Sequence, residues 1–144
     1  MKKSVVIIIA LIYVVAIALV SFLGLNPKTH LDNVYVESIT VTSDREITMI
    51  NGEDTIYFKN EFKDDGEGGK VRRVQLYCEV KPENATNPKI NYVLEEDNTF
   101  ATVDENGLIT ITGEEKTRVF PVYVVSAENP TIAKKIIIWA AAGR

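Results

Sequence analysis

Apolar and polar residues alternate along most of this chain, a pattern typical of β-strands that bury one face. In the clearest segment, Val74, Leu76, Cys78 and Val80 alternate with polar or aromatic neighbours. Pro, Asn, Asp and Gly residues bound such segments at intervals of about ten residues, which predicts an all-β sandwich or barrel of about 7–9 short strands. The expected strands are residues 34–41, 47–50, 55–58, 71–80, 89–94, 99–103, 108–112, 118–127 and 131–140.

The same alternation predicts which side chains share the core. Each of the expected core residues lies between polar or exposed neighbours on its strand, so one face of every strand is apolar. A slip of one residue would turn the whole set to solvent, and the assignment is therefore sharp. The residues expected to be buried together are Val74, Leu76, Cys78, Ile90, Tyr92, Leu94, Ala101, Val103, Ile109 and Ile111.

The largest interruption between strands, Lys59–Lys70, is polar and Gly-rich and is predicted to be a loop. Such loops often carry recognition, so we assign partner binding to Phe62, Lys63, Asp64, Asp65 and Glu67. Its carboxylates could ligate Ca²⁺, but their spacing matches no calcium loop and acidic loops are usually only solvated, so no metal is predicted. If the loop is passive, recognition falls to a strand edge or to the last strand, where residues 136–139 are apolar on both faces.

An uncharged apolar run from Ser4 to Leu25 precedes the expected strands. At ~1.5 Å per residue, a helix of this length is about 33 Å long and can cross the ~30 Å of bilayer hydrocarbon. Lys2 and Lys3 precede the run, and cationic residues beside a span tend to stay in the cytoplasm. We therefore expect a cytoplasmic tip and transmembrane signal anchor in residues 1–25, a juxtamembrane linker in 26–33 and an extracytoplasmic domain in 34–144.

A cleaved secretory signal is the alternative interpretation of this run. Ala16 and Ala18 supply the small residues that a cleavage site after Ala18 requires. The apolar run continues beyond Ala18 to Leu25, however, without the polar boundary that usually follows such a site. An uncleaved anchor, with the protein held in the cell membrane by a single pass, is the preferred prediction.

Charge and cysteine content argue against several function classes. The chain carries 16 Lys and Arg against 20 Asp and Glu, a net charge of -4, and such a surface does not recruit nucleic acid. Cys78 and His30 are the only residues of their kinds, so no intramolecular disulfide can form, and we interpret Cys78 as a buried structural thiol. Nothing positions two carboxylates across a cleft. We predict no enzyme, no cofactor and no small-molecule substrate.

Three segments together resemble the bacterial Ig-like family of group 2. VESITVTSD, from Val36, is similar to the family's opening strand, and VQLYCEVKPENATNP, from Val74, to its second long strand and Pro-Glu-Asn-Ala-Thr turn. FATVDENGLITI, from Phe100, is similar to its strand, Asp-x-x-Gly turn and returning strand. Physically, Asp104 can cap its own turn and Gly107 can take the positive φ of a tight reversal. The turn residues that carry the resemblance are Pro82, Asn84, Asp104 and Gly107.

The chain also departs from this family's pattern. Tyr92 occupies the strand position where the family usually has Trp, no Gly is evident around residues 114–117, and Lys59–Lys70 resembles an insertion. Asn84-Ala85-Thr86 has the form of an N-glycosylation acceptor, but in a chain that resembles a bacterial family it is better explained as the turn itself. The resemblance implies an Ig-like β-sandwich that extends from Val36 to Ala140.

The family's members commonly occur in surface and adhesion proteins. The resemblance and the apolar run therefore lead us to expect a membrane-anchored interaction or structural module, which binds another surface protein or a cell-wall polymer. The alternative is an accessory single-pass subunit of a larger envelope assembly, for which Ala10, Ala16 and Ala18 offer a modest small-residue face for helix pairing. An enzyme is the least favoured class.

Overall fold

The computed structural model describes residues 32–59, 62–112 and 116–142. The predicted membrane helix, Ser4–Leu25, lies outside these residues, and among the residues that are described no helix is long and apolar enough to cross a membrane. Val34–Arg144 forms a compact unit. Its described strands are β1 (Ser38–Ser43), β2 (Ile47–Ile50), β3 (Glu53–Lys59), β4 (Lys63–Asp64), β5 (Lys70–Lys81), β6 (Ile90–Leu94), β7 (Ala101–Val103), β8 (Leu108–Thr112), β9 (Arg118–Ser126) and β10 (Ala133–Ala141).

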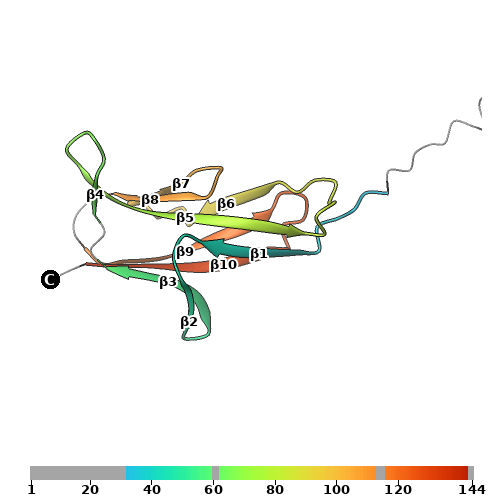
Figure 1. The fold of residues 1–144 in the computed structure, drawn as a ribbon, viewed down its shortest axis with the longest axis horizontal. Coiled ribbons are helices and arrows are strands. Elements are labelled where there is room, and N and C mark those ends of the chain that lie inside the picture. Colours follow the sequence, from blue (N-terminus) through green and yellow to red (C-terminus); the bar gives the residue numbers. More distant parts are fainter. Residues whose placement is uncertain (1–31, 60–61, 113–115, 143–144) are drawn as a thin grey trace, which may run out of the picture. The chain divides into compact units, whose positions relative to one another are not determined.

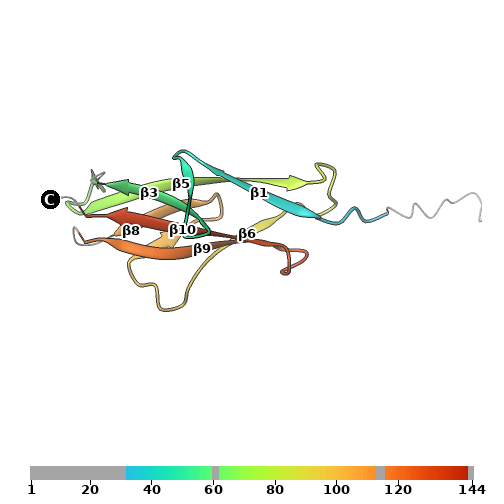
Figure 2. The same cartoon turned by 90° about the horizontal axis from the view of Figure 1, so that it is seen from below.

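These strands form two sheets (Figure 1). The first, called here the β5 sheet, has the order β1-β5-β8-β7, and β4 also pairs with β5; the second, the β10 sheet, has the order β2-β3-β10-β9-β6. Figure 2 shows β3, β10 and β9 side by side along the long axis, with β3 parallel to β10 and β9 antiparallel to it. The prediction of an all-β fold is confirmed, and the two sheets are compatible with a β-sandwich.

One hydrophobic core lies between the inward faces of the sheets. Full burial of one Val, Leu, Ile or Phe side chain in such a core stabilises the folded state by roughly 1.5–3 kcal/mol. Of the predicted core residues, Val74, Leu76, Ala101, Ile109 and Ile111 are buried, as expected. The prediction was wrong in degree for Cys78, Ile90, Tyr92, Leu94 and Val103, which pack against the core but stay partly exposed.

A buried arginine, which the sequence prediction missed, ties the two sheets together. Arg72 is 1% exposed, and its guanidinium donates to the carbonyl oxygens of Ala140 at 3.0 Å and Lys116 at 2.9 Å. The ring of Phe62 covers the same guanidinium, 4.7 Å from its centroid. Arg72 lies on the inward face of β5 with Val74 and Leu76, so the alternation of the sequence already indicated that its side chain is buried. Burial of the guanidinium is tolerated because main-chain carbonyls and an aromatic ring replace water around it.

Candidate functional site

The segment predicted as a recognition loop contains one short strand that pairs with the start of β5. Lys59 is the last residue of β3, and Lys63 and Asp64 form β4, which pairs antiparallel with Val71 and Lys70 of β5. The expectation of a loop was therefore wrong for Lys59, Lys63, Asp64 and Lys70, which lie in strands, whereas residues 65–69 form the turn between β4 and β5. A two-residue strand is too short to leave an alternation in the sequence, which explains why pattern analysis missed it.

The acidic side chains of this hairpin are engaged by its own turn. Asp64 Oδ1 accepts a hydrogen bond from the amide of Gly66 at 2.9 Å, and Asp65 Oδ1 accepts from Glu67 and Gly69, both at 2.8 Å. The hydrogen bonds from Glu67 and Gly69 are the main reasons that the pKa of Asp65 is lowered. Within the described residues, no group of three or more His, Cys, Asp or Glu side chains is placed to hold a metal ion.

The five predicted binding residues do not form one surface. Phe62 lies half-buried against the guanidinium of Arg72, so it contributes to the sheet contact and not to the hairpin tip. Lys63, Asp64, Asp65 and Glu67 are exposed around the turn. Partner binding by these residues stays a prediction, because neither their hydrogen bonds nor their exposure singles out a ligand.

The Asp-x-x-Gly turn has the contacts that the sequence predicts for it. Asp104 Oδ1 accepts from the amides of Asn106 at 2.9 Å and Leu108 at 2.8 Å. Gly107 adopts a φ of 80°, a conformation that costs a residue with a Cβ roughly 1–2 kcal/mol. The turn is thus held by its own hydrogen bonds, and the hairpin of β7 and β8 ends against β5 at this turn.

The turn after β5 anchors the start of the domain. Ala85 donates to the Pro82 carbonyl at 3.0 Å within the turn, and Asn84 is exposed at its surface. Thr86 then clasps the chain ahead of β1, because its amide donates to the Val34 carbonyl at 2.8 Å and its hydroxyl accepts from the Val34 amide at 2.9 Å. These contacts give the motif a structural role.

The outward face of the β10 sheet carries a continuous row of apolar side chains. On β10, Ile136 and Ile138 point into the core, so Ile137 and Trp139 point outward. Across the sheet, Trp139 lies opposite Tyr57 of β3 and Val119 of β9. We call the whole set the outer apolar surface: Tyr57, Val93, Val119, Pro121, Tyr123, Ile137 and Trp139.

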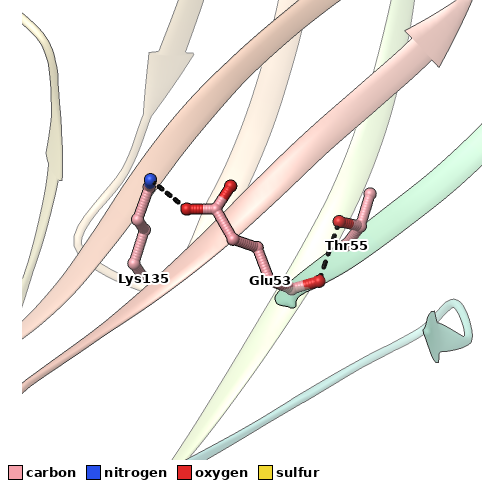
Figure 3. Close-up of polar contacts among 3 residues, drawn as sticks. All are labelled: Glu53, Thr55 and Lys135. Atoms are coloured by element: carbon pink, nitrogen blue, oxygen red, sulfur yellow. Dashed lines mark hydrogen bonds and ion pairs between the residues drawn. The ribbon is translucent and has the colours of Figure 1, made fainter. Parts of the chain in front are cut away.

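Aromatic packing and one ion pair organise this surface. The rings of Tyr57 and Trp139 meet edge to face with centroids 5.4 Å apart. Figure 3 shows the polar border, where Lys135 points at the carboxylate of Glu53 and the Thr55 hydroxyl donates to the Glu53 carbonyl at 3.1 Å. The hydrogen bond to Glu53 is the main reason that the pKa of Lys135 is raised.

The outer apolar surface is suited to contact, not to proton or group transfer. Its seven side chains include no acid, base or nucleophile other than the two phenol groups, whereas Tyr57 and Val119 remain 43% and 55% exposed. Because exposed apolar side chains that gather on one face are a feature of interaction sites, this surface is the candidate site. The sequence prediction included two of the seven, Ile137 and Trp139, within residues 136–139; the other five depended on which strands lie next to β10.

Comparison with known proteins adds no relative. No family model matches the chain, and no curated protein matches it. The functional assignment therefore depends on the surface geometry described above and on the sequence features that precede the domain.

Proposed function

We propose that this protein is a membrane-anchored, extracytoplasmic Ig-like module that binds another surface protein through its outer apolar surface. It has no catalytic role in this proposal. The observation that carries the proposal is the placement of Tyr57, Trp139 and Val119 in one row on the outward face of the β10 sheet. Aromatic side chains are enriched at the centres of protein interfaces, and few charges would have to be desolvated on binding here.

The anchor and the family resemblance support the location and the class. The apolar run from Ser4 to Leu25 is long enough to span a bilayer, and the turn residues Asp104 and Gly107 fit the Asp-x-x-Gly element of the group 2 bacterial Ig-like family. The outward face of the five-stranded β10 sheet offers more contact area to a folded protein than to a single polymer chain. A surface protein is therefore the proposed partner, in preference to a wall polymer.

The binding proposal is tested by site-specific photo-crosslinking of the full chain in its own membrane. A benzophenone amino acid replaces Tyr57 on the outer apolar surface, and the control replaces Thr102, which is exposed on the outward face of β7 in the β5 sheet. We expect a discrete protein adduct from position 57 and none from position 102. Equal adducts from both positions, or adducts at 57 that a wall hydrolase digests, would contradict a protein partner at this surface.

The location is tested separately by protease treatment of intact protoplasts. If residues 4–25 anchor an exported domain, external protease removes everything after about Lys28, because the ~30 Å bilayer shields only the anchor and the tip. A mature N-terminus at Leu19 in the culture medium would show a cleaved signal and contradict the anchor. The crosslinking would then be done on the secreted domain, and the comparison between its two positions would still test the surface.

A further inference from the structure

β5 is longer than the strand that pairs with it on one side. β8 pairs with Val71–Gln75 of β5, and the Leu76 amide then donates to the Gly107 carbonyl at 3.0 Å. Beyond this bond no described strand pairs with that side of β5, whereas β1 covers the opposite side as far as Lys81. In Figure 1, β5 accordingly runs past the ends of β7 and β8. Residues 77–81 thus have one open edge.

The main-chain groups at this edge can be assigned from their neighbours. Gln75 turns its carbonyl toward β1, where it accepts from Asp44 at 3.1 Å, and Leu76 turns its amide toward Gly107 on the other side. Because backbone polar groups alternate sides along a strand, those of Cys78 and Val80 point to the open edge. Two N–H donors and two carbonyl acceptors are therefore presented to an incoming strand.

A groove of about 710 Å³ lies along this open edge. Cys78 and Val80 of β5 and Ile90 and Tyr92 of β6 line it, and the turn residues Glu105 and Asn106 also lie in its wall. These four strand residues face inward but are only partly buried, whereas Val74 and Leu76, on the same face of β5, are 0% exposed. The inward side chains of β5 are fully buried where β8 pairs with the strand, and only partly buried beyond Leu76, where no described strand pairs with that side.

We propose that this groove binds an extended segment of another protein, which pairs antiparallel with Tyr77–Lys81 and turns alternate apolar side chains onto Ile90 and Tyr92. Addition of a strand to an open edge satisfies main-chain groups that other ligands leave unpaired. We take the antiparallel direction because antiparallel pairing is slightly more stable per residue than parallel pairing, and because β5 pairs antiparallel with β1, β4 and β8. This site differs from the outer apolar surface, so it does not depend on the proposed function.

Charge complementarity defines the segment further. Glu79 and Lys81 are exposed on the outward face of β5, two residues apart. Opposite charges directly across a strand pair are favourable and like charges are not. The bound segment therefore carries an acidic residue opposite Lys81 and a basic residue opposite Glu79, with an apolar residue between them. The exposed Lys81–Glu83 contact at 4.0 Å is weak enough for an incoming carboxylate to replace.

A designed peptide tests the site directly. Thr-Val-Asp-Val-Lys-Val-Thr places its acid opposite Lys81 and its base opposite Glu79 when antiparallel, and the control Thr-Val-Lys-Val-Asp-Val-Thr exchanges the two charges. The full chain in detergent micelles is titrated with each peptide, and the iodoacetamide alkylation rate of Cys78 and the hydrogen exchange of its amide are followed. We expect the first peptide to slow the alkylation of Cys78 and the exchange of its amide until the site is saturated. The second peptide should bind about tenfold more weakly, because both cross-strand charge pairs change from attractive to repulsive.

Matched variants separate edge pairing from nonspecific apolar binding. Val80→Pro removes an N–H donor at the open edge and leaves the β1 side intact, so it should abolish protection, whereas Val80→Thr keeps the donor and should retain it. If Val80→Pro fails to fold, the double variant Glu79→Lys with Lys81→Glu decides the question, because it should reverse the preference between the two peptides.

Three results would overturn the proposal. The first is that about 5 mM peptide slows neither the alkylation of Cys78 nor the exchange of its amide, which limits the affinity to weaker than millimolar. The second is that the charge-exchanged variant does not reverse the preference between the two peptides. The third is that alkylation and exchange slow as the protein concentration rises in the absence of peptide. The last result would identify a second copy of this chain as the occupant.

Discussion

The amide of Leu76 donates to the carbonyl of Gly107 at 3.0 Å, and this bond ends the pairing between β5 and the hairpin of β7 and β8. The approach is close because residue 107 has no Cβ. A Cβ on Gly107 would lie 2.7 Å from Tyr92 Cζ and 2.8 Å from the Leu76 carbonyl oxygen. The same contact that closes the core therefore sets the boundary of the open groove.

Gly107→Ala should be strongly destabilising. The substitution combines a positive φ with overlap against backbone and ring atoms, so we expect a loss of roughly 2–5 kcal/mol in the free energy of unfolding. Gly66→Ala is the matched control, since Gly66 also has a positive φ, 87°, but its added Cβ meets nothing within 4 Å. Urea unfolding followed by Trp139 fluorescence measures both. Equal losses would mean that the close approach costs nothing.

Leu76→Ala tests the assignment of the inward face of β5. Leu76 is 0% exposed, and truncation of a buried Leu usually costs about 2–5 kcal/mol. Its neighbour Tyr77 points outward, so Tyr77→Ala should change the free energy of unfolding by only about 0.5 kcal/mol. A reversed order of the two losses in the same urea titration would show that the face of the strand is assigned wrongly.

Arg72→Lys should destabilise the domain although it conserves the charge. A lysine ammonium cannot span the carbonyl oxygens of Ala140 and Lys116 as the guanidinium does, and it leaves a buried acceptor unsatisfied. We expect a loss of about 1–3 kcal/mol in the free energy of unfolding. Arg73→Lys, one residue further and exposed, should cost at most about 0.5 kcal/mol. Similar losses in thermal unfolding of the two variants would argue against the buried role.

The thiol of Cys78 should lose its proton only at high pH. Burial, followed by the charge of Glu79, raises its pKa from 9.0 to about 11, so iodoacetamide alkylation of the folded chain should reach half its maximal rate near that pH. In urea the midpoint should return toward the ordinary value. Because the folded pKa lies above the unfolded one, the neutral thiol favours folding below pH 9, and this contribution is lost as the pH rises from 9 to about 11.

A matched variant separates the two causes of that shift. Glu79→Gln removes the neighbouring charge but leaves the burial, so the alkylation midpoint of the folded chain should fall only part of the way. A midpoint that remains near pH 9 in the folded wild-type chain would contradict the partial burial of the thiol beside the groove.

The sequence by itself determined the all-β class, most strand positions and the local turn chemistry. The side chains of Val74 and Leu76 are assigned to the core by a period of two, and the hydrogen bonds of Asp104 and the φ of Gly107 lie within a few residues of chain. Such features depend on local geometry, which a single stretch of sequence specifies. Arg72 was also within reach, because it shares the inward face with Val74.

Only the tertiary structure decided which strands are neighbours, and with that the surfaces. Tyr57 and Trp139 lie far apart in the chain and meet because β3 pairs in parallel with β10. Cys78 and Tyr92 fit the alternation of a buried face, yet they stay partly exposed because β8 begins opposite Gln75 and covers β5 only from there to Val71. Whether a residue is buried depends on the strands that cover it, which come from other parts of the chain. The alternation of residues within one strand says nothing about how far a neighbouring strand extends.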